Sequence, residues 1–140
     1  MPSTPPALPE PLVTKRPKRI VMVDDSVAYA ETWRKGLEAR YGEKVTFESY
    51  ANPIQAIPVL GPGIDLLLLD LEMPVFDGRK LAALAAQRGV PCKRIVIISA
   101  HDADELHALF STETCLAVIN KTEPRQQQAF LMILDSVVKR

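Results

Sequence analysis

The chain has 140 residues and 47% hydrophobic content, the size and composition of one globular domain with a proper core. Its 17 basic and 17 acidic residues give a formal net charge of zero, which argues against a nucleic-acid-binding module held by phosphate contacts. No apolar stretch is long enough to span a bilayer and no signal-peptide pattern opens the chain, so we expect a cytoplasmic protein without membrane insertion.

The first 17 residues differ from the rest because six prolines prevent a helix or a central strand there. We expect residues 1–17 to form a flexible, proline-rich arm and residues 18–140 to form the folded domain. A basic cluster lies at the junction and comprises Lys15, Arg16, Lys18 and Arg19. It is either a contact for an anion or a partner, or a solvated entry to the first strand, which is the more ordinary outcome.

The first apolar strand, which begins near Lys18, ends in two adjacent carboxylates, Asp24 and Asp25, followed by Ser26. Adjacent carboxylates repel each other, so a pair at a strand end is costly unless a cation neutralises it. Mg²⁺ suits this role because it prefers oxygen ligands. Asp25 or Ser26 could also cap the next helix, and the two interpretations are compatible.

The next elements follow from periodicity and from proline positions. A helix from about Ser26 to Tyr41 is predicted, and its apolar face should comprise Val27, Ala30, Trp33 and Leu37. The alternating residues 45–50 predict an edge strand. Asn52 and Pro53 then open a helix, which Pro58 should keep short or kinked.

A run of four leucines from Leu66 to Leu69 ends in Asp70, and the chain then breaks at Pro74 and Gly78. This pattern predicts a buried strand that carries Asp70 to the edge of a sheet. A buried charge is unfavourable, so Asp70 should lie at the open end of the strand, where it binds a cation or takes part in a reaction. Alternatively, Asp70 only accepts a hydrogen bond in the turn that follows.

Two further apolar runs end in Ser99 and in Lys121. Helices are predicted from Gly78 to about Arg88, over about residues 102–110, and from about residue 122 to the end of the chain. The last helix has an apolar surface wider than one stripe, which suggests a contact with a partner or a homodimer. Cys92 and Cys115 lack metal-ligand spacing and are expected to be core thiols.

Alternating strands and helices, with strands too apolar to face water, predict an α/β fold with a parallel sheet covered on both sides. Right-handed crossovers make it a doubly wound fold. In such folds ligands bind beyond the carboxyl ends of the strands, where the strand order reverses. This rule brings Asp24, Asp25 and Asp70 together.

Taken in order, these polar strand ends resemble the receiver domain of a two-component response regulator. The resemblance covers almost the whole chain after the arm, at spacings close to those usual in the family. The residues that carry it are Asp24-Asp25, Asp70, Met73-Pro74, Asp77-Gly78, Ser99-Ala100 and Lys121. The resemblance implies a flavodoxin-like (βα)5 fold whose five parallel strands follow the order 2-1-3-4-5.

The resemblance also implies a stand-alone signalling switch rather than an enzyme, although one that assists its own phosphotransfer and autodephosphorylation. Asp70 would accept a phosphoryl group from a histidine kinase or a histidine phosphotransfer protein. The surface of the fourth helix, fifth strand and fifth helix would then change and bind a downstream protein target. Because the chain ends at Arg140, soon after the last helix, we expect it to act through other proteins rather than through a fused output domain.

The same resemblance assigns Mg²⁺ as the cofactor. Its ligands would be the carboxylates of Asp25 and Asp70, the Glu72 backbone carbonyl, and Asp24 through a water. Two further site residues would contact the phosphoryl oxygens, namely Lys121 through its ammonium and Ser99 through its hydroxyl.

The chain departs from the family pattern at three places. Thr122 follows the lysine where proline across a cis bond is usual, and a cis bond there would cost about 3 kcal/mol, so we predict a trans or a strained link. Val118 replaces an aromatic residue that swings inward on activation, so any switching must use other side chains. Glu72 and His101 border the path of an incoming water and should modulate the lifetime of the phosphoryl bond.

Two other classes remain open. A pseudo-receiver would be a phosphorylation-independent binding module, and the altered Val118 and Thr122 are compatible with it, although no acid, serine or lysine is lost. A haloacid-dehalogenase-like phosphatase is suggested by Asp70 and the acid two residues later. That motif normally holds a second aspartate where Glu72 stands, and it opens the domain rather than closing a third strand.

Overall fold

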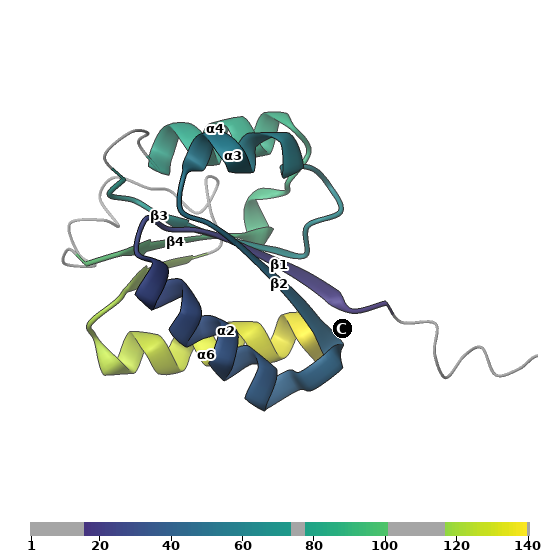
Figure 1. The fold of residues 1–140 in the computed structure, drawn as a ribbon, viewed down its shortest axis with the longest axis vertical. Coiled ribbons are helices and arrows are strands. Elements are labelled where there is room, and N and C mark those ends of the chain that lie inside the picture. The colour runs from purple at the N-terminus through teal and green to yellow at the C-terminus, as the bar shows by residue number, and fades with distance from the viewer. Residues whose placement is uncertain (1–15, 74–77, 101–116, 140) are drawn as a thin grey trace, which may run out of the picture.

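Five strands form one parallel sheet in the computed structural model, which describes residues 16–73, 78–100 and 117–139 (Figure 1). The sheet order is β2-β1-β3-β4-β5, which confirms the predicted doubly wound, flavodoxin-like topology. The strands are β1 (Lys18–Val23), β2 (Val45–Tyr50), β3 (Leu66–Asp70), β4 (Ile95–Ser99) and β5 (Ala117–Asn120).

Helices cover both faces of the sheet. Figure 1 shows α2 (Val27–Tyr41) and α6 (Pro124–Lys139) on one face, with α3 (Pro53–Ala56) and α4 (Gly78–Gln87) on the other. Three short 3-10 turns complete the described elements, namely η1 (Gly42–Lys44), η2 (Ile57–Val59) and η3 (Cys92–Arg94).

The core has two layers because successive strand residues point to opposite faces of the sheet. The strand residues that pack against α2 and α6 include Ile20, Met22, Leu66, Leu68, Val96 and Ile98. Their neighbours in sequence pack under α3 and α4, and include Val21, Val23, Leu67, Leu69, Ile95 and Ile97. Strands buried on both faces need continuous apolar sequence, which explains why β3 and β4 show no polar alternation.

Strand register brings the polar strand ends to one edge of the sheet. The last paired residues are Val23 with Leu69, Asp70 with Ile98, and Ser99 with Asn120. At this edge Asp24 follows β1, Asp70 ends β3, Ser99 ends β4 and Lys121 follows β5.

The predicted boundaries of α2 are confirmed, but one residue of its predicted apolar face is wrong. Ala30 and Leu37 are buried, and Trp33 packs edge-on against Phe130 with ring centroids 4.7 Å apart. Val27, however, is 68% exposed. It is the first residue of the helix, at the open edge of the sheet, and the buried side chains of the helix begin at Ala30.

The short helix α3 forms as the sequence predicts. The Asn52 side chain accepts a hydrogen bond from the Ile54 N–H at 2.9 Å, and Pro53 occupies the first turn. Pro58 lacks an N–H group, so the α-helix gives way to η2 there. Residues 45–50 form the edge strand β2, also as predicted.

Most apolar side chains of α6 are buried or partly buried against other residues of the chain. Phe130, Leu134 and Val137 are buried. The partly buried residues Leu131, Ile133 and Val138 pack against the same cluster, and of the apolar side chains on this helix Met132 is the most exposed, at 73%. Most of the apolar surface of this helix is therefore covered within the chain, and the predicted contact with a partner or a second copy stays a prediction.

Cys92 is half-buried in η3 rather than a full core residue as predicted, because the turn lies outside the sheet. The helix predicted over about 102–110 lies outside the described residues, as do His101, Cys115 and most of the proline-rich arm. No helix in the described ranges has the length and hydropathy needed to cross a membrane.

Candidate functional site

Three carboxylates meet at the carboxyl edge of the sheet. One oxygen from each of Asp24, Asp25 and Asp70 lies within 4.8 Å of the other two. Asp24 and Asp70 are 2% and 3% exposed, whereas Asp25 is open to solvent. The first and third strands are neighbours, so residues 45 positions apart in sequence become adjacent in space.

Asp24 is held by the backbone on both sides. Its N–H donates to the Tyr50 carbonyl at 3.1 Å, and its Oδ1 accepts from the Ser26 N–H at 2.8 Å. Ser26 in turn caps α2, since its Oγ accepts from the Tyr29 N–H at 3.2 Å. The capping interpretation is thus confirmed for Ser26.

The Asp70 carboxylate accepts a hydrogen bond in the turn that follows β3 and also belongs to the acidic cluster. Its Oδ1 accepts from the Glu72 N–H at 3.2 Å, so the hydrogen-bonded turn foreseen as the simpler alternative does form. The turn then closes on the next helix, because the Gly78 N–H donates to the Leu71 carbonyl at 3.2 Å. These bonds fix the direction of the Asp70 carboxylate at the end of β3.

Lys121 supplies the positive charge of the site. Its Nζ lies 2.8 Å from Asp24 Oδ2 and 3.6 Å from Asp70 Oδ1. The ammonium also lies over the Tyr29 ring, 4.6 Å from its centroid. Burial alone would lower the pKa of Lys121, but the contact with Asp24 and the charge of Asp70 outweigh it, so this pKa is raised. The lysine therefore stays charged.

The backbone of the lysine is fixed to β4, since the Lys121 N–H donates to the Ser99 carbonyl at 2.7 Å. The Lys121–Thr122 bond is trans, because the described residues contain no cis peptide. Asn120 Oδ1 accepts from both the N–H and the hydroxyl of Thr122, each at 2.8 Å. Sequence reasoning missed this asparagine turn, although Asn before a break in a strand is a usual turn signal.

The protein alone does not neutralise the negative charge of the acidic cluster. Burial and then the charge of Asp24 raise the pKa of Asp70 to about 7. Asp24 Oδ2 is buried and, apart from its ion pair with Lys121, forms no hydrogen bond with any described residue. A hard divalent cation prefers oxygen ligands, and this cluster offers three carboxylates, including the buried Oδ2 of Asp24. The residues present therefore fit Mg²⁺.

Glu72 has a second role that sequence reasoning missed. Its Oε1 accepts hydrogen bonds from the Ser99 hydroxyl and from the Ala100 N–H, the latter at 3.2 Å. Ser99 is fully buried, so its hydroxyl depends on such a partner. The Glu72 side chain thus crosses from the end of β3 to the end of β4, and we call this contact the Glu72–Ser99 clamp. No local pattern signals it, because the two residues are 27 positions apart.

Of the other residues singled out from the sequence, Val118 does not join the cluster. Val118 is buried under α3 and α4, on the opposite face of the sheet from Tyr29 and α2. His101 lies outside the described residues.

The fold and this edge define a class of protein: a doubly wound α/β domain with three clustered carboxylates and a lysine at its topological switch point. A model of the response regulator receiver domain matches residues 20–129, which is most of the chain. The chain therefore belongs to the response regulator receiver family, a family of two-component signalling domains.

Similar proteins agree with this assignment. An uncharacterized response regulatory protein of Yersinia pestis is 31% identical over 93 residues, which cover 64% of this chain but only 37% of that protein. A Francisella receiver domain superposes with a TM-score of 0.71 and 17% identity, covering 88% of this chain and 98% of the other. The Thermotoga maritima response regulator TrrA, solved in complex with Mg²⁺-BeF, gives 0.68 and 19%, covering 86% and 98%.

Proposed function

We propose that Asp70 accepts a phosphoryl group from a histidine kinase or a histidine phosphotransfer protein, and that the chain then binds a downstream protein in the cytoplasm. The observation that carries this proposal is the convergence of Asp24, Asp25, Asp70 and Lys121 at the carboxyl ends of separate strands. No haloacid-dehalogenase-type arrangement is needed to explain it, because Asp70 closes the third strand and its neighbour Glu72 serves Ser99.

In the proposed reaction an Asp70 oxygen attacks the phosphorus atom carried by a donor imidazole. The bond from phosphorus to the imidazole nitrogen breaks, and the nitrogen keeps the electron pair and takes up a proton. Lys121, already 3.6 Å from Asp70, pairs with a phosphoryl oxygen as a compact positive charge. Asp24, Asp25, Asp70 and the Glu72 carbonyl would hold Mg²⁺, which when bound neutralises charge on the transferring oxygens.

The Glu72–Ser99 clamp adds a condition to this reaction. The Ser99 hydroxyl can donate to a phosphoryl oxygen only if it leaves the Glu72 carboxylate. Release of the clamp would also free the Ala100 N–H, at the start of the segment after β4. Since Ser99 is bonded through its backbone to Lys121, the rearrangement would reach β5 and α6. These elements, with the predicted helix over about 102–110, form the proposed output surface.

The proposal is tested by incubation with acetyl phosphate and Mg²⁺, followed by intact-mass measurement. The wild-type chain should gain one phosphoryl group, and Asp70→Asn should gain none, because the nucleophilic oxygen is lost. Glu38→Gln, which removes an exposed carboxylate on α2, is the matched control and should react like wild type. An adduct that survives in Asp70→Asn would refute the proposal, and an unreactive wild type would favour the pseudo-receiver.

Removing the clamp should change the rate of this reaction. Glu72→Ala should be phosphorylated by acetyl phosphate roughly tenfold faster, because a hydrogen bond to a charged group contributes about 1.5–3 kcal/mol and no longer holds Ser99. Glu72→Gln, which keeps an acceptor but loses the charge, should be intermediate. In the Ser99→Ala background the gain from Glu72→Ala should disappear. Equal gains in both backgrounds would show that Glu72 acts by charge alone.

A further inference from the structure

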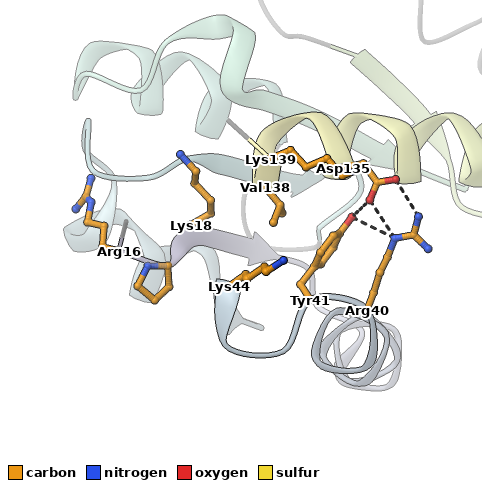
Figure 2. Close-up of a pocket in the computed structure, with 9 residues that line it drawn as sticks. Arg16, Lys18, Arg40, Tyr41, Lys44, Asp135, Val138 and Lys139 are labelled. Atoms are coloured by element: carbon orange, nitrogen blue, oxygen red, sulfur yellow. Dashed lines mark hydrogen bonds and ion pairs between the residues drawn. The ribbon is translucent and has the colours of Figure 1, made fainter. Parts of the chain in front are cut away.

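A cavity of about 700 Å³ lies at the amino end of the sheet. Figure 2 shows the residues that line it. The start of β1, the turn η1 and the last turns of α2 and α6 form its walls. β1 runs from this cavity to Asp24 over six residues, so the two sites are roughly 20 Å apart. Its basic lining residues are Arg16, Lys18, Arg40, Lys44 and Lys139.

The charge of this lining is unbalanced. Against five cations it holds one carboxylate, Asp135, so its formal charge is +4 in a chain whose net charge is zero. The Asp135 carboxylate is already bonded within the protein (Figure 2). It accepts hydrogen bonds from the Arg40 guanidinium at 2.9 and 3.1 Å and from the Tyr41 hydroxyl at 2.5 Å. These bonds lower the pKa of Asp135 to about 2. The remaining four cations form no ion pair with any described residue.

Ordinary structural roles explain only part of this clustering. Arg40 and Lys139 lie in the last turns of α2 and α6, where a cation stabilises the helix dipole. Arg16 and Lys18 belong to the entry of β1 and have no such role. Arg19, their neighbour, is bonded instead to Glu48 at 2.6 Å and 3.0 Å and does not line the cavity. Like charges gathered around one concavity repel each other unless an anion enters it.

We propose that this cavity binds a small phosphate-bearing anion of nucleotide size. Its volume falls within the range of about 300–1,000 Å³ that is usual for small-molecule sites. Lysine and arginine provide charge-assisted hydrogen bonds to phosphate oxygens. Pro17, the Tyr41 ring and Val138 supply apolar wall for the organic part of the ligand. The proposal does not depend on phosphorylation of Asp70, because the two sites share no residue.

Calorimetric titration of the full chain with ATP, in a buffer with EDTA and low salt, tests this inference. ATP should bind, pyrophosphate should bind more weakly, and adenosine should not bind, because both the phosphates and the ring contribute. The double variant Lys44→Gln with Lys139→Gln should weaken ATP binding by at least about tenfold. Both side chains are exposed, so the variant should stay folded, with only a small loss of thermal stability from the missing Lys139 charge at the end of α6.

The matched control removes two exposed lysines elsewhere, Lys35→Gln with Lys93→Gln, and should change ATP affinity by less than about twofold. Equal weakening by both double variants would overturn the proposal, since net charge alone would then explain binding. No ATP binding to wild type would also overturn it. Binding of a deca-glutamate peptide through Lys44 and Lys139 without ATP binding would reassign the cavity to an acidic protein segment.

Discussion

Replacing Lys121 with methionine should lower the free energy of unfolding by about 3 kcal/mol in metal-free buffer at pH 8. The substitution keeps the length of the side chain but leaves the carboxylate of Asp24, 2% exposed, without its ion pair. Removing one member of a buried pair costs about 3–5 kcal/mol, and we take the low end because the lysine side chain is 17% exposed. Urea unfolding in EDTA measures the change.

Repeating the unfolding measurement with added Mg²⁺ tests the site more specifically. The variant has lost the only cation that the described residues place against the three carboxylates, so added Mg²⁺ should stabilise it more than it stabilises wild type. Lys121→Arg keeps the charge and should retain most of the metal-free stability. If Lys121→Met unfolds like wild type in EDTA, the carboxylates are neutralised in another way and the proposed site is wrong.

Replacing Gly78 with alanine should destabilise the fold by about 3 kcal/mol and impair phosphorylation of Asp70. A Cβ atom at this position would lie 2.6 Å from the Asp70 carbonyl oxygen and 2.8 Å from the Leu71 Cα. Both atoms belong to the backbone and cannot rotate away, so either the helix or the strand end must shift. Because that strand end carries the Asp70 carboxylate, the shift acts on the site itself. Urea unfolding and the acetyl phosphate assay report the two effects.

Gly36→Ala is the matched control. Gly36 lies in the interior of α2 with nothing within 4 Å of an added Cβ. Alanine there should stabilise the chain by about 0.5–1 kcal/mol, because it lowers the entropy of the unfolded state at no steric cost. Opposite signs for the two substitutions are expected. A mild effect at Gly78 would mean that the turn after Asp70 yields easily and does not fix the direction of the carboxylate.

Local sequence patterns predicted the secondary structure well where each element follows a strong rule. The uninterrupted leucines before Asp70 formed β3 because a strand buried on both faces needs apolar side chains at every position. Ser26 and Asn52 began helices because their side chains accept the first free N–H groups. The prediction for Val27 was wrong because periodicity shows which face of a helix is apolar but not where the core ends along that helix. The prediction for Cys92 rested on the lack of metal-ligand spacing, which does not show how deeply a thiol is buried.

The sequence by itself determined that carboxylates, a hydroxyl and a lysine end separate buried strands, because strand-end chemistry is local and parallel topology follows from few rules. Only the tertiary structure decided which of these groups touch. It joined Lys121 to Asp24 and Glu72 to Ser99, and it gathered five basic residues around one cavity at the far end of the sheet. Such pairings depend on strand register and on side-chain direction between residues distant in sequence, and no pattern within one segment contains that information.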